Sequence, residues 1–363
     1  MKAKSAKRVM AAILAAVMGF SLVGCGGQDD GGKDSAQVEG EEKIPVKIAG
    51  LPYIYAMPFV YSAENGLYDN FDYTIDYYSS GPVQNEAIAS GAWEVGVEGI
   101  GGVITGAAGY NLKTIAFTNS DTDVTDLWVR ADSELAQIEP DEKGVRGTAD
   151  DWRGKKILCP TGSSCHMLLI ATLEHMGLTQ DDVEIIDTAV AQSYAAFKAG
   201  EADVVALWSP FGFEAEEEGW VRVATVKDLG LEMPCAVVAT EEAVENRPEM
   251  VQAWLETYLK SSEELAKNPE QTAQDFYEFE EEQGIAISEK TAQKEVEYRP
   301  FITLEQQKEY FAEEADGTSK AEKILLDYAD FMISQGKMTE EDKQNMIENG
   351  FVDGSFIANI DEL

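Results

Sequence analysis

Three short stretches rich in glycine and hydroxyl residues could bind an anion without any arginine. They are Gly81-Pro82-Val83, Gly99-Ile100-Gly101-Gly102 and Thr161-Gly162-Ser163-Ser164, and each stands where a strand or loop leads into an expected helix. The N–H groups of a helix's first turn have no partner inside the helix and lie at its positive end. Small side chains let a ligand approach this backbone. We therefore expect the three stretches to converge on one oxyanion site.

A second group of residues would give this site flat walls and a carboxylate. Tyr53, Tyr55 and Trp208 offer aromatic faces, and Glu98 offers a negative charge to an amine or ring nitrogen. No Lys or Arg occurs in the expected pocket loops, so an organic molecule with an oxyanion and an amine fits better than an inorganic anion. The predicted ligand-binding residues are Tyr53, Tyr55, Gly81, Pro82, Asn85, Glu98, Gly99, Ile100, Thr161, Gly162, Ser163, Ser164, His166, Gln192, Trp208 and Ser209.

The adjacent Cys165 and His166 raise the alternative of nucleophilic catalysis. Neighbours on a helix point about 100° apart and do not easily form a dyad. A helix start can lower a thiol pKa, but a small residue filling a tight turn is the better explanation of Cys165. The sequence contains neither G-x-x-x-x-G-K-[ST] nor H-E-x-x-H, and its two histidines lack metal-ligand spacing. We expect a binding protein with no cofactor and no metal, not an enzyme.

The N-terminus predicts export. Four basic residues between Lys2 and Arg8 precede an apolar run from Val9 to Leu22, which is shorter than the roughly 20 residues of a spanning helix. Leu22-Val23-Gly24-Cys25 resembles the lipobox of bacterial lipoproteins, which implies lipidation of Cys25. We therefore expect a signal peptide over residues 1–24, a lipidated flexible tether over 25–43 and a location outside the cytoplasm, anchored to the cell membrane.

The charge of the chain excludes some partners. The sequence has 67 acidic and 28 basic residues, a formal net charge of −39. Such a field repels nucleic acid and anionic lipid headgroups. Three further cysteines, Cys159, Cys165 and Cys235, are an odd number, so the sequence leaves open whether one disulfide forms.

The arrangement of elements predicts an α/β fold with two lobes. Strands and helices alternate from Val46 to about Ala239. A helix ended by Gly91 leads into Glu94-Val95-Gly96-Val97, and a helix ended by Gly200 leads into Asp203-Val204-Val205-Ala206. Two such units, each with polar residues after a buried strand, predict a clamp with its site between the lobes. We expect residues 44–130 and 235–363 to form lobe 1 with its C-terminal helices, and residues 131–234 to form lobe 2.

Six stretches in order carry a resemblance to a known family. They are Ser79-Ser80-Gly81-Pro82-Val83-Gln84-Asn85-Glu86-Ala87-Ile88-Ala89-Ser90-Gly91, Val95-Gly96-Val97-Glu98-Gly99, Trp152-Arg153-Gly154-Lys155-Lys156-Ile157, Pro160-Thr161-Gly162-Ser163-Ser164-Cys165-His166, Ala206-Leu207-Trp208-Ser209-Pro210-Phe211 and Asn268-Pro269-Glu270. Together they resemble the extracytoplasmic solute-binding proteins of ABC importers, in the nitrate/sulfonate/taurine-type branch. The resemblance implies a type II periplasmic-binding-protein-like clamp, with a mostly parallel sheet and flanking helices in each lobe. It also implies that a small solute is passed to a membrane permease, and we expect a monomer.

Two departures from the family bear on the ligand. Ser209 stands where relatives often carry an acid, and Glu98 stands where they usually carry a small or apolar residue. We expect a taurine-like or aliphatic sulfonate, with a thiamine-precursor pyrimidine stacked between the aromatics as the alternative. A pyrimidine-precursor synthase of the same fold is a weaker alternative, because its cysteine-rich motif is absent from the sequence. We expect the chain to cross between the lobes at Leu127–Arg130 and near Cys235.

Overall fold

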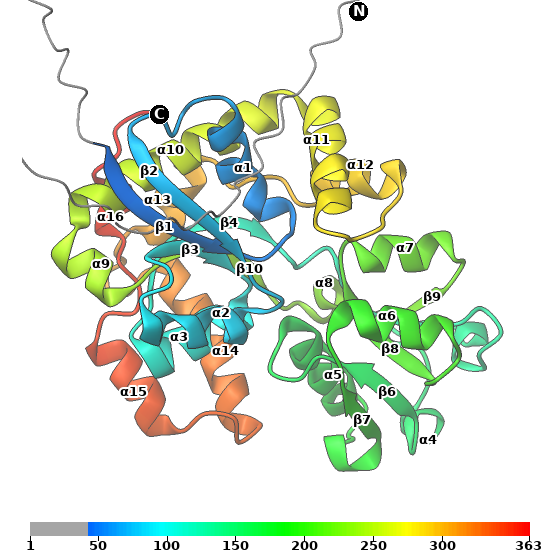
Figure 1. The fold of residues 1–363 in the computed structure, drawn as a ribbon. Helices are drawn as coiled ribbons and strands as arrows, with labels where there is room; N and C mark the ends of the chain where they lie inside the picture. The colour runs from blue at the N-terminus through cyan, green and yellow to red at the C-terminus, as the bar shows by residue number, and fades with distance from the viewer. Residues whose placement is uncertain (1–42) are drawn as a thin grey trace, which may run out of the picture. The chain divides into compact units, whose positions relative to one another are not determined.

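The computed structural model describes residues 43–363. The expected signal peptide, Cys25 and all but the last residue of the expected tether lie outside these residues. Within them the chain forms two five-stranded sheets with helices packed against each (Figure 1). None of the helices in the described part combines the length and apolar character needed to cross a membrane.

The two sheets have the same strand order. In the first, β2-β1-β3-β10-β4, the strands are β1 (Ile44–Gly50), β2 (Phe71–Tyr77), β3 (Val95–Glu98), β4 (Lys113–Ser120) and β10 (Pro234–Ala239). In the second, β7-β6-β8-β5-β9, they are β5 (Thr125–Val129), β6 (Lys156–Cys159), β7 (Glu184–Asp187), β8 (Val204–Trp208) and β9 (Val221–Thr225). The glycines that end the two repeated helices, Gly91 and Gly200, both have a positive φ, which suits glycine. The two halves are therefore repeats of one topology, as the sequence predicted.

The sheets are mixed but mostly parallel, as predicted, because four of the five strands in each run in the same direction. β10 is antiparallel to β3 and β4, and β5 is antiparallel to β8 and β9. Each of these two strands enters its sheet from the other half of the chain, β5 directly after β4 and β10 after β9 and a short helix over Val226–Leu229. Neither strand is reached from its own sheet through a βαβ crossover, the connection that makes neighbouring strands parallel.

The predicted lobe boundary also differs from the strand pairing. We placed residues up to 130 in lobe 1, but Thr125–Val129 pairs in the second sheet. The first crossing between the sheets therefore lies at residues 121–124, before the predicted Leu127–Arg130, whereas the second precedes β10 near Cys235 as predicted. The crossings are joined, because Asp121 N–H donates to the Met233 carbonyl at 2.8 Å and Met233 N–H donates to Thr122 Oγ1 at 2.9 Å.

Helices pack against both sheets (Figure 1). Those along the first half are α1 (Met57–Glu64), α2 (Gly81–Glu86) and α3 (Ile100–Tyr110), and those along the second half are α4 (Ala149–Trp152), α5 (Ser164–His175), α6 (Val190–Lys198), α7 (Phe211–Glu217) and α8 (Val226–Leu229). The C-terminal tail forms α9 (Glu241–Asn246), α10 (Pro248–Lys267), α11 (Pro269–Glu282), α12 (Glu289–Tyr298), α13 (Leu304–Phe311), α14 (Lys320–Ser334), α15 (Glu340–Glu348) and α16 (Ser355–Ala358).

Most of the tail packs on the first half, with α10 against α1 and both α14 and α15 against α3. Two tail helices also contact the second half: α12 contacts α7, and Phe331 of α14 stands edge-on to His166 of α5 with ring centroids 6.0 Å apart. Glu214 on α7 accepts a hydrogen bond from Ser288 N–H at 2.9 Å and one from Thr291 Oγ1 at 2.6 Å, and Lys294 pairs with Glu216 at 2.8 Å. The tail therefore touches both halves.

Candidate ligand-binding site

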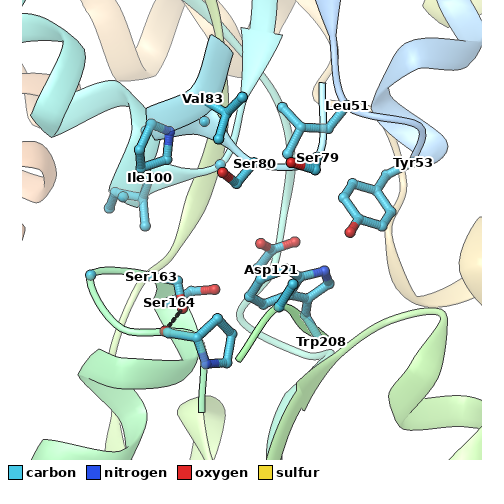
Figure 2. A pocket seen from close by; sticks show the side chains of 18 of the residues that line it. Leu51, Tyr53, Ser79, Ser80, Val83, Ile100, Asp121, Ser163, Ser164 and Trp208 are labelled. Atoms are coloured by element: carbon cyan, nitrogen blue, oxygen red, sulfur yellow. Dashed lines mark hydrogen bonds between the residues drawn. The ribbon is translucent and has the colours of Figure 1, made fainter. Parts of the chain in front are cut away.

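A cavity of about 380 Å³ lies between the two halves and is lined by residues of both. Leu51, Ser79, Ser80, Val83 and Ile100 line one side, and Ser163, Ser164 and Trp208 line the facing side (Figure 2). Asp121, from the first crossing, lies between the two sides with its carboxylate toward the space. The volume is within the range of small-molecule sites.

Four helices begin at this cavity without a capping side chain. The N-cap residues of these helices all line the cavity: Ser80 of α2, Gly99 of α3, Ser163 of α5 and Ala189 of α6. None of them has a side chain that accepts a hydrogen bond from the backbone N–H groups of its own helix. The Ser163 hydroxyl instead donates to the Pro160 carbonyl at 2.6 Å. Free N–H groups of the first turns of the three longer helices, α3, α5 and α6, are thus available to a ligand.

The first turns from the two halves approach each other closely. A Cβ added at Gly101 of α3 would lie 2.6 Å from the Gly162 carbonyl oxygen and 3.2 Å from the Ser163 Cα. Within the first half, a Cβ at Gly81 would lie 2.5 Å from the Gly102 Cα. Only glycine fits at these positions, which is the physical reason for the glycine-rich stretches that the sequence analysis singled out.

Three aromatic rings form one end of the cavity. Tyr53 stands edge-on to Tyr55, with ring centroids 5.7 Å apart, and to Trp208, with centroids 6.3 Å apart. The interplanar angles of 72° and 89° mean that Tyr53 forms a parallel slot with neither of the other two rings. Burial raises the pKa of the Tyr53 and Tyr55 hydroxyls, so both are neutral donors at physiological pH.

An arginine that the sequence analysis missed also lines the cavity. Arg299 follows α12, and its guanidinium donates to Asp121 Oδ1 at 2.7 Å, to Glu295 Oε2 at 3.2 Å and to the Ser209 hydroxyl at 3.3 Å. The guanidinium is buried and two carboxylates offset its charge, so the cavity gains little positive potential from it. The usable signal was the i, i+4 spacing of Glu295 and Arg299 just before Pro300, which is typical of a helix end.

Comparison with known proteins places the chain in a family. A family model described as NMT1/THI5 like matches residues 54–272, more than half of the chain. The chain belongs to this family. The predicted relationship to solute-binding proteins of ABC importers is confirmed by the names of the chain's relatives.

Relatives of this NMT1/THI5-like chain are named as binding proteins. A protein of Brachyspira hyodysenteriae, provisionally named an ABC transporter periplasmic binding protein, is 27% identical over 343 residues, which is 93% of this chain and 94% of the relative. The taurine-binding periplasmic protein of Escherichia coli is 25% identical over 194 residues, covering 52% of this chain and 58% of that protein. The alkanesulfonate-binding protein SsuA of Xanthomonas axonopodis, solved with MOPS, shares the fold, with a TM-score of 0.65 and 19% identity over 83% of this chain and 96% of that chain. These names agree with a binding protein and not an enzyme.

Most of the predicted residues of this family member lie together around the cavity. Eleven of them line it, namely Tyr53, Tyr55, Gly81, Pro82, Gly99, Ile100, Thr161, Gly162, Ser163, Ser164 and Trp208. The lining residues outside the predicted set include some that are ordinary by type, such as Leu51 and Ser79, and three that carry charge, Asp121, Asp187 and Arg299. Asp187 is held in place by Thr161 N–H, which donates to its carboxylate at 2.9 Å.

Five predicted residues do not line the cavity. The largest difference is Glu98, which is fully buried behind the glycine turns and so cannot face a ligand amine directly. Asn85 donates to the Gly102 carbonyl at 2.8 Å, and Ser209 accepts from Arg299. His166 is buried and accepts from Gly162 N–H at 3.3 Å, so it shapes the loop before α5, while Gln192 is exposed on α6.

The cysteines offer no activated nucleophile. Cys159, Cys165 and Cys235 are buried and free in the described part of the chain. Burial raises the pKa of the Cys165 thiol, the opposite of the lowering that a helix start can produce. Among residues 43–363, no three His, Cys, Asp or Glu side chains come together to hold a metal ion.

Proposed function

We propose that the chain is a monomeric, extracytoplasmic solute-binding protein, anchored through a lipidated Cys25, that delivers a small zwitterion to an ABC permease. The ligand class that fits best is an aminosulfonate such as taurine. The observation that carries the proposal is the set of uncapped helix starts at α3, α5 and α6, which face one cavity with a carboxylate on its wall.

The oxyanion would bind at the helix starts. In α3, the N–H groups of Gly102 and Val103 donate to the Gly99 carbonyl, which leaves those of Ile100 and Gly101 for a ligand. The start of α5 lies on the opposite side of the cavity, so one sulfonate group can accept from both halves and favour their closure. A sulfonate has three oxygens for this purpose, one more than a carboxylate.

The amine would bind at Asp121. Among the described residues that line the cavity, Arg299 is the one cationic side chain, and it is already paired with Asp121 and Glu295. With Asp121 and Asp187 both on the wall, an anion alone would meet two carboxylates and no unpaired cation. A ligand ammonium that pairs with the Asp121 carboxylate, beside Arg299, supplies the positive charge that offsets this repulsion.

The stacked pyrimidine is less well supported than an aminosulfonate. A flat ring held by stacking needs exposed aromatic faces in a parallel arrangement. Tyr53 and Tyr55 are buried and present edges to their neighbours, and Trp208 is perpendicular to Tyr53. The pyrimidine therefore enters the experiment as a competing ligand.

Calorimetry on the purified chain with taurine, ethanesulfonate, nitrate and an aminopyrimidine tests the proposed ligand class. We expect taurine to bind more tightly than ethanesulfonate, because only taurine offers an ammonium to Asp121. The Asp121→Asn variant should lose this preference by about tenfold, and the matched Asp187→Asn variant should lose less, because Thr161 N–H already occupies Asp187. Tight nitrate binding that is indifferent to both substitutions would overturn the assignment.

Mass spectrometry of the mature N-terminus tests the anchor separately. The proposal expects a diacyl- or triacyl-modified Cys25 as the first residue. A mature chain that begins elsewhere without lipid would contradict the anchor and leave the ligand assignment standing.

A further inference from the structure

Glu98 is the one predicted site residue whose structural setting is chemically unusual. Its exposed fraction is 0%, and neither carboxyl oxygen has a hydrogen-bond partner among the described residues. It lies at the end of β3, directly before the N-cap of α3. A buried carboxylate without partners is costly, so a carboxyl in such a place has to be explained.

The carboxyl lies beneath the glycine turns that face the cavity. Glu98 Oε2 is 2.7 Å from the position of a Cβ at Gly102 and 3.6 Å from that of a Cβ at Gly81. These glycines belong to the first turns of α3 and α2, whose backbones touch each other at this point. Glu98 therefore fills the space on the side of the two turns that faces away from the ligand.

No backbone group of these turns stabilises a charge on Glu98. The N–H groups of Gly102 and Val103 donate to the Gly99 carbonyl, and the Asn85 amide donates to the Gly102 carbonyl. Asn85 Oδ1 is also buried without a partner, so a protonated carboxyl would supply a donor where acceptors are in excess. A charged carboxylate here would oppose a ligand oxyanion at the other side of the same helix start.

The groups around Glu98 offer no counter-charge. The α2 side chains that pack nearby, Gln84 and Asn85, are uncharged. On the neighbouring strand Cys235 adjoins Ala236, the residue paired with Glu98, and burial raises its pKa so that it stays a thiol. Asp121 approaches Gly99 from the first crossing, but it is an acid and is paired with Arg299. Burial without a cation raises the pKa of Glu98 well above its usual value and outweighs the lowering by the neighbouring Asn85 amide.

We propose that Glu98 is a positioning residue whose uncharged carboxyl supports the first turns of α2 and α3 and keeps their N–H groups in place for the ligand's oxyanion. This role rests on the proposed function for its effect on binding. It replaces the direct contact with a ligand amine that the sequence suggested. Two of its consequences, described next, are measured without any ligand.

The first measurement is infrared spectroscopy near neutral pH. The wild-type chain should show a protonated-carboxyl stretch that the Glu98→Gln variant lacks. A spectrum in which the substitution removes only a carboxylate band would overturn the proposal, because Glu98 would then be charged.

The second measurement is thermal unfolding across pH. In the unfolded chain Glu98 titrates near 4.5, and its folded pKa is higher, so the folded state binds the extra proton. The stability that this proton gives the folded state is fully present below pH 4.5 and is lost as pH rises. The Tm of Glu98→Gln relative to that of wild type should therefore increase as pH rises above 4.5. The matched control is Asp126→Asn in β5, a buried carboxyl of the second sheet whose pKa is raised to about 7, so its difference from wild type should stop changing near that pH. A Glu98→Gln difference that is constant with pH contradicts the proposal.

The third measurement is calorimetry with taurine and ethanesulfonate near neutral pH. Glu98→Gln keeps the shape without charge and should bind within about threefold of wild type, whereas Glu98→Ala removes the support and should bind about tenfold more weakly. Tighter binding by Glu98→Gln of about tenfold would reveal a charged Glu98, and weaker binding of that size would reveal direct contact with the ligand's cation; either overturns the proposal.

If no sulfonate binds the wild type, the proposed function fails while the spectra and the pH profile still decide the state of Glu98. Should Glu98→Ala not fold, the Gln variant and the spectra suffice.

Discussion

The four helices that begin at the cavity have no capping side chain, whereas five of the eight helices in the C-terminal tail have one. The other three tail helices, α10, α11 and α16, begin without one. In the tail, Thr240, Ser288, Thr303, Ser319 and Thr339 each accept a hydrogen bond from the first turn of their own helix. At the cavity, the N-caps of α2, α3, α5 and α6 accept none, even where the residue is serine. A capping side chain ordinarily stabilises a helix by about 1 kcal/mol. Four uncapped helix starts around one cavity support the proposal that their N–H groups bind a ligand.

The two groups of helix starts have different roles, one in stability and one in binding. Capped helices α13 to α15 stabilise the tail, whereas uncapped starts leave binding groups exposed at some cost in stability. Helix α12 belongs to both regions, because Ser288 caps its start while Arg299 after its end enters the cavity. Substitutions in the two regions should therefore affect stability and binding differently.

The largest effect is expected where the two regions meet, at Arg299. Replacing it by Met leaves Asp121 and Glu295 buried without a cation, so Arg299→Met should lower the free energy of unfolding by about 3–5 kcal/mol. The control is Arg153→Met, which breaks a half-exposed pair with Asp182 and should leave the free energy of unfolding nearly unchanged, because solvent screens such a pair. Denaturant unfolding measures both. Equal small losses would mean that the tail's contact with the cavity is not structural.

A smaller effect, confined to binding, is expected at Gly101. The methyl of Gly101→Ala would meet the Gly162 carbonyl across the cavity and hold the halves apart, so affinity for taurine should fall about 10- to 100-fold. The matched control is Gly109→Ala on the same helix, where a Cβ would meet no atom within 4 Å. Both variants replace a helical glycine, and the control should gain up to about 1 kcal/mol in stability with unchanged affinity.

Small-angle scattering adds a second readout for these two variants. The radius of gyration should decrease on adding taurine for wild type and Gly109→Ala, and less for Gly101→Ala. Matching decreases in all three proteins would contradict the close approach of the two helix starts.

The smallest effects come from single hydroxyls and sharpen the comparison most directly. Thr339→Ala removes the cap of α15 and should lower the unfolding free energy by about 1 kcal/mol with affinity unchanged. Ser163→Ala removes a hydroxyl that caps no helix but donates to the Pro160 carbonyl in the loop before α5. Loss of this hydrogen bond should lower stability by about 0.5–1 kcal/mol, and taurine affinity should fall severalfold because the loop that positions the start of α5 is held less firmly. Calorimetry measures the affinity of both variants and denaturant unfolding measures their stability. An affinity loss in Thr339→Ala but not in Ser163→Ala would contradict the different roles of the two groups of helix starts.

The sequence predicted the fold and the backbone part of the site well, for physical reasons. Glycine runs such as Gly99–Gly102 mark places where backbones touch, and the buried strands β3 and β8 read as short apolar segments between turn signals. Such features depend on local sequence. Local sequence was therefore sufficient to predict eleven of the residues that line the cavity.

The charged part of the site depended on tertiary structure and was not predicted. Arg299 reaches the cavity because α12, a helix with few apolar residues that the periodicity did not reveal, packs against α7. Glu98 looked like a ligand contact because it ends a buried strand, but its side chain turns behind the glycine turns. The lobe boundary was misplaced for a similar reason, since strand pairing assigns β5 to its sheet and a linear sequence does not show it.

The most direct test of the central claim is the crystal structure of the chain with taurine bound. The account predicts that sulfonate oxygens accept hydrogen bonds from the N–H groups of Ile100 or Gly101 in α3 and from the first turn of α5, with the ammonium at the Asp121 carboxylate. A sulfonate bound to Arg299, with the first turns of α3 and α5 facing only water, would contradict it.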